Sequence, residues 1–247
     1  MLSPEPVVFT PSQDADDAVK AFERYDLISA PVVDERNKLV GRVTVDAIMD
    51  YSRRKRDEEA LKRAGLRGEE DIFASVAASA RNRWFWLAVN LLTAFFASRV
   101  IGVFEEAIGR LVALAALMPI VASIGGNTGN QTVALIVRGL ALDHIHKSNV
   151  PFLLFKEIRV SLLNGFLWGG FMGIVTMILY RNVSLGLVMG TAMLLNLIVA
   201  ALVGVLVPLF LDRFGYDPAQ GSSVLLTFTT DSMGFFIFLG LASAFLL

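Results

Sequence analysis

Two otherwise apolar stretches of the chain contain polar residues of the kind that bind hard cations. In the run Gly125-Gly-Asn-Thr-Gly-Asn-Gln131, the residues Asn127, Asn130 and Gln131 stand at i, i+3 and i+4. This spacing places the three carboxamides on one face of a helix. Neutral oxygens along a hydrated path suit a hard cation or its water shell, so the complete cluster favours a permeation path. The alternative is polar packing between transmembrane helices, where Gly, Asn and Gln are common.

The backbone of this run is expected to contribute as well. Pro119 and the pair Gly125-Gly126 should bend or break a helix, which frees carbonyl oxygens there. Irregular backbone at membrane depth persists only inside protein or beside water. We therefore expect the backbone at Gly126 and the nearby carboxamides to line one path. Asn90, in an earlier apolar stretch, is expected to matter less for conduction than Asn127.

The second stretch contains a carboxylate. Thr227, Asp231 and Gly234 stand at i, i+4 and i+7 in a stretch that is otherwise apolar, so they form a narrow polar stripe. An aspartate at the centre of a membrane helix costs about 2.5–3.5 kcal/mol, so it should face a cavity or a partner group. Asp231 is therefore interpreted as a cation-binding carboxylate in a pore. The alternative is a buried ion pair with Arg99.

Five apolar stretches are expected to position these groups, because a membrane-spanning helix needs about 20 mainly apolar residues. The expected spans are 84–104, about 111–137, about 160–180, 183–211 and about 219–246. Lys and Arg gather before the first span and in the loops after the second and fourth spans. The positive-inside rule therefore predicts a multi-pass protein of the cell (inner) membrane, with its N-terminus cytoplasmic and its C-terminus outside.

The composition agrees with a membrane protein. Of the residues, 55% are hydrophobic and 18% are charged, whereas a soluble domain has about 25% charged residues. A net charge of −1 argues against nucleic acid as a partner. The absence of Cys excludes thiolate metal sites, and no motif of an enzyme or of a bound cofactor is present. His144 and His146 stand two residues apart, which predicts a loop and not a metal pair on one helix face.

The N-terminal part predicts a small α/β head, and the chain as a whole predicts an all-α polytopic membrane protein behind it. A helix is expected near residues 14–25, a strand–turn–strand unit over 30–45, and a further helix from Val45 to about Ala64. The predicted domains are the head at 1–50, a connecting, plug-like helix and linker at 51–83, and a transmembrane domain at 84–247. About 45 residues cannot bury enough surface to be stable alone, so the head should pack against a second copy or another element.

Two groups of residues carry a resemblance to known families. The segment Ser29-Ala-Pro-Val-Val-Asp-Glu, with Leu39-Val-Gly-Arg-Val-Thr-Val-Asp46, resembles a CBS motif, a module that normally works in pairs. Pro119, the run Gly125–Gln131 and Thr230-Asp-Ser-Met-Gly234, in this order behind a CBS-like head, resemble the MgtE family of magnesium channels. The resemblance implies a homodimer with a magnesium-selective pore between its subunits.

The same resemblance implies roles for individual residues. It makes Asp231 and the carbonyl of Thr227 pore ligands, and it makes Asp217 an acidic residue near the inner mouth. The alternative for Asp217 is a helix cap before Pro218.

Family members sense cytosolic Mg²⁺ through acidic residues of the CBS modules and of the helix that joins them to the membrane. The residues at matching positions are Asp26, Asp50, Glu58 and Glu59. Ala47 and Lys55 replace expected acids, and the N-terminal domain and the first CBS module of the family are missing from this chain. For the two glutamates, a solvated helix face with i,i+4 basic partners is the alternative.

The sequence therefore predicts a dimeric Mg²⁺ channel or transporter in the lipid bilayer, with Mg²⁺ as the transported ion and as a regulator. Inward attraction of a divalent cation is worth roughly 4.6 kcal/mol at 100 mV, so import needs no other energy source. Two alternatives stay open. One is a carrier for another divalent cation, or a proton-coupled exchanger with Asp231 as the proton site. The other is a membrane-anchored regulator that senses nucleotides with its CBS-like head.

Overall fold

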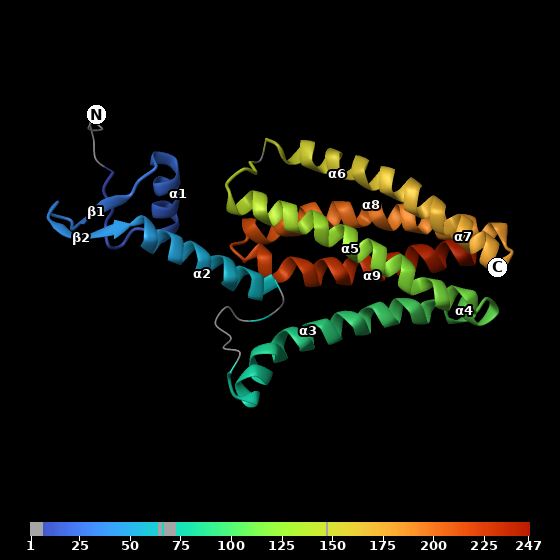
Figure 1. The fold of residues 1–247 in the computed structure, drawn as a ribbon. Coiled ribbons are helices and arrows are strands. Elements are labelled where there is room, and N and C mark those ends of the chain that lie inside the picture. Colours follow the sequence, from blue (N-terminus) through green and yellow to red (C-terminus); the bar gives the residue numbers. More distant parts are fainter. Residues whose placement is uncertain (1–6, 64–65, 67–72, 147) are drawn as a thin grey trace. The chain divides into compact units, whose positions relative to one another are not determined.

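The structure is a computed structural model that describes residues 7–63, 66, 73–146 and 148–247. The chain forms two compact units, and Figure 1 colours the ribbon from blue at the N-terminus to red at the C-terminus. One unit contains the described residues up to Lys62, and the other contains the described residues from Phe73 onward.

The first unit is a small α/β fold. Its elements are α1 (Ala15–Tyr25), β1 (Ser29–Val33), β2 (Leu39–Thr44) and α2 (Val45–Arg63). The Asp14 side chain accepts a hydrogen bond from the N–H of Asp16 and so caps the start of α1. The two strands pair antiparallel, and their core side chains are Phe9, Ala18, Phe22, Ala30 and Ile48. Ile28, Leu39 and Val40 remain exposed, so this unit does not cover all of its own apolar surface.

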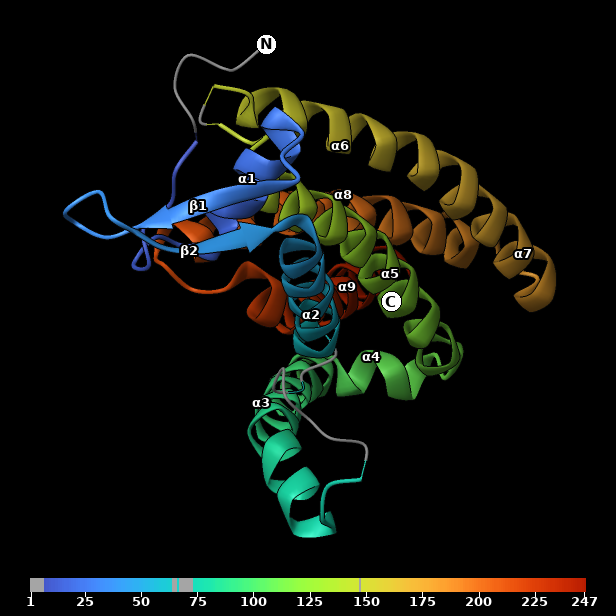
Figure 2. The same ribbon diagram turned by 60° about the vertical axis from the view of Figure 1, so that its left-hand side comes forward.

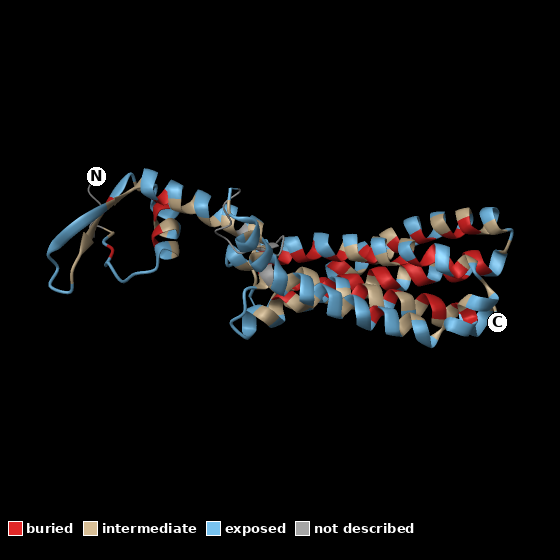
Figure 3. Cartoon of the chain, turned by 90° about the horizontal axis from the view of Figure 1, so that it is seen from below, coloured by how far each residue is buried: buried red, intermediate tan, exposed pale blue. Residues whose placement is uncertain are grey.

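The second unit is a helical bundle. Its elements are α3 (Val76–Val103), α4 (Glu105–Arg110), α5 (Ala113–Ala141), α6 (Val150–Asn164), the π-helical turn η1 (Gly165–Gly169), α7 (Gly170–Tyr180), α8 (Val183–Arg213) and α9 (Pro218–Phe245). Figures 1 and 2 show α5, α8 and α9 side by side, with α3 along α9. Buried residues concentrate on the sides where these helices meet (Figure 3). In the most apolar window of each helix, 39% of the residues of α8 are buried but only 6% of those of α3.

Among the described residues, four helical stretches are long and apolar enough to cross a membrane. They are Val76–Val103, Val150–Tyr180, Val183–Arg213 and Gly221–Phe245. α5 is not one of these four stretches, although it has 29 residues, because the polar run at its centre lowers its mean hydropathy. The prediction of a helical membrane protein with a small α/β head is confirmed, whereas the count of five spans is not.

Pro119 and the pair Gly125-Gly126 were predicted to bend or break α5, and the structure contradicts a break. The helix runs without interruption from Ala113 to Ala141, with Pro119 inside it. The low helix propensity of Gly125 and Gly126 is outweighed by packing, since Gly125 lies buried against the Asn196 side chain of α8. In a continuous helix, a carbonyl accepts the N–H four residues further on, so the expectation of a freed carbonyl at Gly126 does not hold.

The third span begins earlier than predicted. The helix that was expected to start at about residue 160 starts at Val150, directly after the loop that follows α5. Lys156 and Arg159 made this part of the sequence look like a loop. The charges are tolerated because Glu157 turns inward, whereas Lys156 keeps half of its side chain exposed.

Candidate functional site

The three carboxamides of α5 lie together on its exposed side. Asn127, Asn130 and Gln131 are exposed, whereas the neighbouring Gly125 and Gly129 are buried. Their arrangement on one helix face is the one that the i, i+3, i+4 spacing predicts. The same seven-residue run therefore has one polar, open side and one side packed into the bundle.

A second row of polar groups runs along α9 next to these carboxamides. Ser223, Thr227 and Asp231 stand one turn apart, and none of the three is fully buried. The Ser223 hydroxyl donates a hydrogen bond to Oδ1 of Asn130 at 2.9 Å, so the rows on α5 and α9 are adjacent. We call these six residues the polar stripe: Asn127, Asn130, Gln131, Ser223, Thr227 and Asp231.

Asp231 lines a cavity of about 700 Å³ between α3 and α9. The cavity is also lined by Thr227 and Ser223 from α9 and by Asn90 and Thr93 from α3. Asn90 therefore lies on the wall of the same cavity as Asp231, although it was expected to matter less for conduction than Asn127. Sequence reasoning missed Asn90 and Thr93 because the residues of α9 that they lie near are at least 130 positions away in the sequence. Their signal was two polar residues three positions apart in an apolar helix.

The structure does not contain the ion pair that was the alternative for Asp231. Among the ion pairs between described residues, none joins Asp231 to Arg99. The Arg99 guanidinium lies 5.6 Å from the ring centroid of Phe95, on its own helix. This contact is a cation–π interaction that needs no carboxylate.

Asp217 begins α9. Its carboxylate accepts a hydrogen bond from the N–H of Ala219 at 2.9 Å, and Pro218 occupies the first helical position. This is the cap geometry that the alternative interpretation predicted. With a rise of about 1.5 Å per residue, Asp217 lies about 21 Å along the helix from Asp231, so the two carboxylates lie at different depths of the bundle.

Among the residues that the structure describes, the acids predicted to sense Mg²⁺ do not form a metal-binding group within one chain. Asp26 ends α1 in a left-handed conformation, Asp50 is exposed on α2, and Glu58 is half-buried there. The side chain of Glu59 lies outside the described residues. In the part of the chain that the structure describes, no three His, Asp or Glu residues form a group that could hold a metal ion.

A different charged cluster links α1 to α2 in the first unit. Lys55 contacts the Asp16 carboxylate, and the Tyr51 hydroxyl donates to the same carboxylate at 3.2 Å. The hydrogen bond from Lys55 lowers the pKa of Asp16 below its ordinary value. Partial burial, together with the nearby Asp16 charge, raises the pKa of Tyr51.

Glu157 of α6 is a buried carboxylate that sequence reasoning missed. Its Oε2 accepts a hydrogen bond from the Thr132 hydroxyl of α5 at 3.1 Å, and its Oε1 lies 3.4 Å from Nζ of Lys156. The signal was an acid close to an apolar run, and it was overlooked because the span was expected to start after it. Glu157 and Thr132 join α6 to the side of α5 that faces away from the carboxamides.

Asn196, at the centre of α8, joins three helices. Its Nδ2 donates to the carbonyl of Val121 in α5 at 2.9 Å, and a Cβ at Gly234 of α9 would lie 2.8 Å from the same nitrogen. A Cβ at Gly125 of α5 would also come closest to this nitrogen. The close approach is possible only because neither glycine has a side chain.

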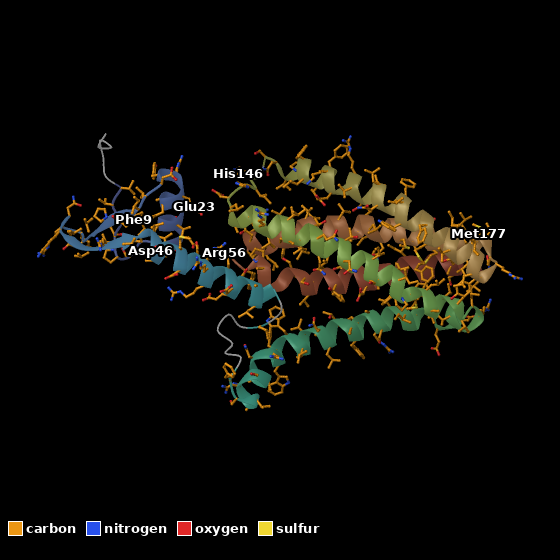
Figure 4. The ribbon with its side chains drawn as sticks, viewed as in Figure 1. Phe9, Glu23, Asp46, Arg56, His146 and Met177 are labelled. Atoms are coloured by element: carbon orange, nitrogen blue, oxygen red, sulfur yellow. The ribbon has the colours of Figure 1, made fainter. Side chains whose placement is uncertain are left out.

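His144 and His146 lie in the loop between α5 and α6, where Figure 4 labels His146. Asn149 closes this loop, because its Nδ2 donates to the carbonyl of His144 at 2.9 Å and its Oδ1 accepts from the N–H of His146 at 3.0 Å. The prediction of a loop is confirmed.

Comparison with known proteins adds independent findings. A family model described as MgtE, divalent cation transporter, matches residues 118–241, and a CBS domain model matches residues 1–54. The first match contains the whole polar stripe. It contains none of α3, so Asn90 and Thr93 lie outside it. A transporter description agrees with the prediction that the chain is not an enzyme.

Three curated relatives carry the name magnesium transporter MgtE. The chain is 36% identical to the protein of Bacillus subtilis over 95% of its own length and 52% of the relative. It is 32% identical to that of Enterococcus faecalis, over 94% of this chain and 51% of the relative. It is 31% identical to that of Thermus thermophilus, over 98% of this chain and 54% of the relative. The chain thus spans about half the length of these relatives.

Proposed function

The chain belongs to the MgtE family of divalent cation transporters, and from this premise we propose that it carries Mg²⁺ across the membrane along the polar stripe. The observation that carries the proposal is the stripe itself, a row of carboxamide, hydroxyl and carboxylate groups on two adjacent helices of the bundle, none of them fully buried. Its oxygens are the ligands that Mg²⁺ and its water shell prefer.

The stripe supports a pore between two copies of the chain. Polar groups at membrane depth avoid lipid and face protein or water. A two-fold axis beside the stripe would bring two Asp231 carboxylates together, and their two negative charges would balance one divalent cation. The homodimer thus covers the polar stripe and completes the ion site at once.

The direction of Mg²⁺ transport and its regulation follow from the distribution of charged residues. The basic residues before α3 and in the loops after α5 and α8 support a cytoplasmic N-terminus, and Asp217 then stands at the inner mouth. Mg²⁺ enters down its electrochemical gradient.

Cytosolic Mg²⁺ closes the pore by bridging acids of two apposed heads, because clustered carboxylates repel one another until a cation binds. The acids involved are Asp26, Asp50, Glu58 and Glu59.

Mg²⁺ flux into liposomes tests this proposal. The purified full chain is reconstituted with a Mg²⁺-sensitive dye inside the vesicles, and wild type is compared with Asp231→Asn. The substitution keeps the side-chain shape and removes the charge, so flux should fall to the level of empty liposomes. Glu106→Gln, a change of one exposed carboxylate on α4, serves as the matched control and should leave flux intact. Unchanged flux in Asp231→Asn at equal reconstitution overturns the proposal.

A further inference from the structure

The cavity between α3 and α9 extends well beyond Asp231. Phe96 contacts Phe228 with ring centroids 6.3 Å apart, and Phe104 contacts Phe236 at 5.9 Å. In each pair the two residue numbers differ by 132, so α3 and α9 run parallel in a fixed register. With about 1.5 Å rise per residue, Asn90 lies at the level of Ser222, about 14 Å from the level of Asp231.

One face of α3 forms the wall of this cavity. The lining residues of α3 recur at the helical spacing, and the polar ones nearest Asp231 are Asn90 and Thr93. Other faces of α3 carry exposed apolar side chains such as Leu91, Leu92 and Phe95, which suit lipid. The two polar residues therefore lie on the one side of α3 that faces a neighbouring helix.

Each hydroxyl group that lines the cavity already donates its proton in a hydrogen bond to another group of the protein. Thr93 donates to the carbonyl of Asn90 at 2.8 Å, and Thr227 donates to the carbonyl of Ser223 at 2.9 Å. Ser223 donates to Asn130. Each hydroxyl oxygen is left with lone pairs that accept hydrogen bonds. A row of acceptors leading to a carboxylate suits the water molecules around a cation, whose hydrogens point outward.

The size of the cavity fits a cation that keeps its water shell. Six waters at about 30 Å³ each occupy about 180 Å³, which is well below the cavity volume of about 700 Å³. Arg83 lines the end of the cavity away from Asp231, about 24 Å along the helix from the level of that carboxylate. At this separation the guanidinium does not form an ion pair with the Asp231 carboxylate.

We propose that α3 lines the ion path together with α9, and that Asn90 and Thr93 hold the water shell of a divalent cation on its way to or from Asp231. This inference rests on the proposed function and names two specificity-determining residues outside the stripe.

Thiol labelling of the full chain in liposomes tests this inference, because the protein has no Cys of its own. Single Asn90→Cys and Thr93→Cys variants are treated with a small, positively charged thiosulfonate reagent, which reacts with thiolates in contact with water. Both should be modified. Mg²⁺ should slow the reaction about tenfold, the factor expected at about 10 mM Mg²⁺ for a site with a Kd of about 1 mM. Ser98→Cys, at an exposed position of α3 away from the cavity, is the matched control and should resist modification.

A flux measurement covers the case in which a cysteine variant does not fold. Thr93→Val removes the hydroxyl and keeps the shape, so it should raise the Mg²⁺ concentration for half-maximal flux, whereas Ser98→Ala should not. Absence of labelling, labelling that Mg²⁺ does not slow, or an unchanged half-maximal concentration in Thr93→Val overturns the inference. In each of those cases a loss of flux in Asp231→Asn still supports the stripe. Unchanged flux in Asp231→Asn overturns the proposed function itself.

Discussion

The two faces of α5 differ in what the same seven residues do. On one face, Gly125 and Gly129 are buried against Asn196 of α8 and Leu226 of α9, and a Cβ at Gly129 would lie 2.5 Å from Cδ1 of that leucine. On the other face, Asn127 and its neighbouring carboxamides are exposed. Helix packing and a permeation path were alternatives for this run, but packing occupies only one face of the helix, and the other face is the one on which we propose the ion path.

The largest effect is expected on the buried face. Gly125→Leu forces a side chain into the Asn196 carboxamide, which also binds the carbonyl of Val121. Overpacking of this kind costs about 3 kcal/mol, so little folded protein should remain. The measurement is the yield of monodisperse protein in detergent and its thermal unfolding. Leu at the exposed Asn127 is the matched control, and equal losses at both positions would mean that the two faces do not differ.

The next effect concerns the bond that joins the buried face to α6. Thr132→Val leaves one oxygen of the buried Glu157 carboxylate without its donor, which should lower the free energy of unfolding by about 2 kcal/mol. Glu157→Leu in the same chain removes the stranded acceptor, so the double variant should regain part of that loss. A double-mutant cycle from thermal unfolding measures the coupling. Additive losses would show that this bond does not stabilise the bundle.

A smaller free-energy effect with a different readout is expected on the exposed face. Asn127→Leu should leave folding intact and reduce Mg²⁺ flux about tenfold, which corresponds to about 1.4 kcal/mol for one lost polar contact to the hydrated ion. Flux per folded protein in liposomes is the quantity to compare. If flux per folded protein is preserved while unfolding becomes easier, the exposed face serves packing as well, and the contrast between the faces is lost.

Patterns local in sequence predicted much of this structure. The helix around residues 14–25, the strand–turn–strand unit after it and the boundaries of α8 and α9 all follow from spacing, caps and apolar runs. The carboxamides of α5 share one face because that depends only on i, i+3 and i+4 spacing. Their helix carries through the glycines, however, against the local rule for Pro and Gly, because contacts with α8 and α9 outweigh propensity.

Contacts between distant segments could not be predicted in this way. Nothing in the sequence near Asn196 indicates that two glycines, one from α5 and one from α9, meet its carboxamide. The position of Asn90 beside the cavity depends on how α3 packs on α9, and the partner of Glu157 depends on how α6 packs on α5. In each case the local residue type was visible, whereas the partner that gives it a role was not.

The smallest effect is expected in the first unit, where a charged contact is exposed and not buried like those of α5. Lys55 and Asp16 keep 40% and 39% of their side chains exposed, so solvent screens their attraction and its loss should cost less than about 1 kcal/mol. Because Lys55 lowers the pKa of Asp16, the stabilisation is present above the unfolded pKa of about 3.9. It is lost as the pH falls through the lower pKa of the folded state.

Lys55→Met should therefore speed amide hydrogen exchange in α1 slightly at neutral pH, and the difference from wild type should shrink as the pH falls below about 4. Exchange is followed by mass spectrometry on the full chain, with Lys38→Met in the exposed turn between β1 and β2 as the matched control. A loss above about 2 kcal/mol at neutral pH would place this contact among the buried ones. A difference that persists at low pH would mean that Lys55 stabilises α1 by packing of its aliphatic stem and not by its charge.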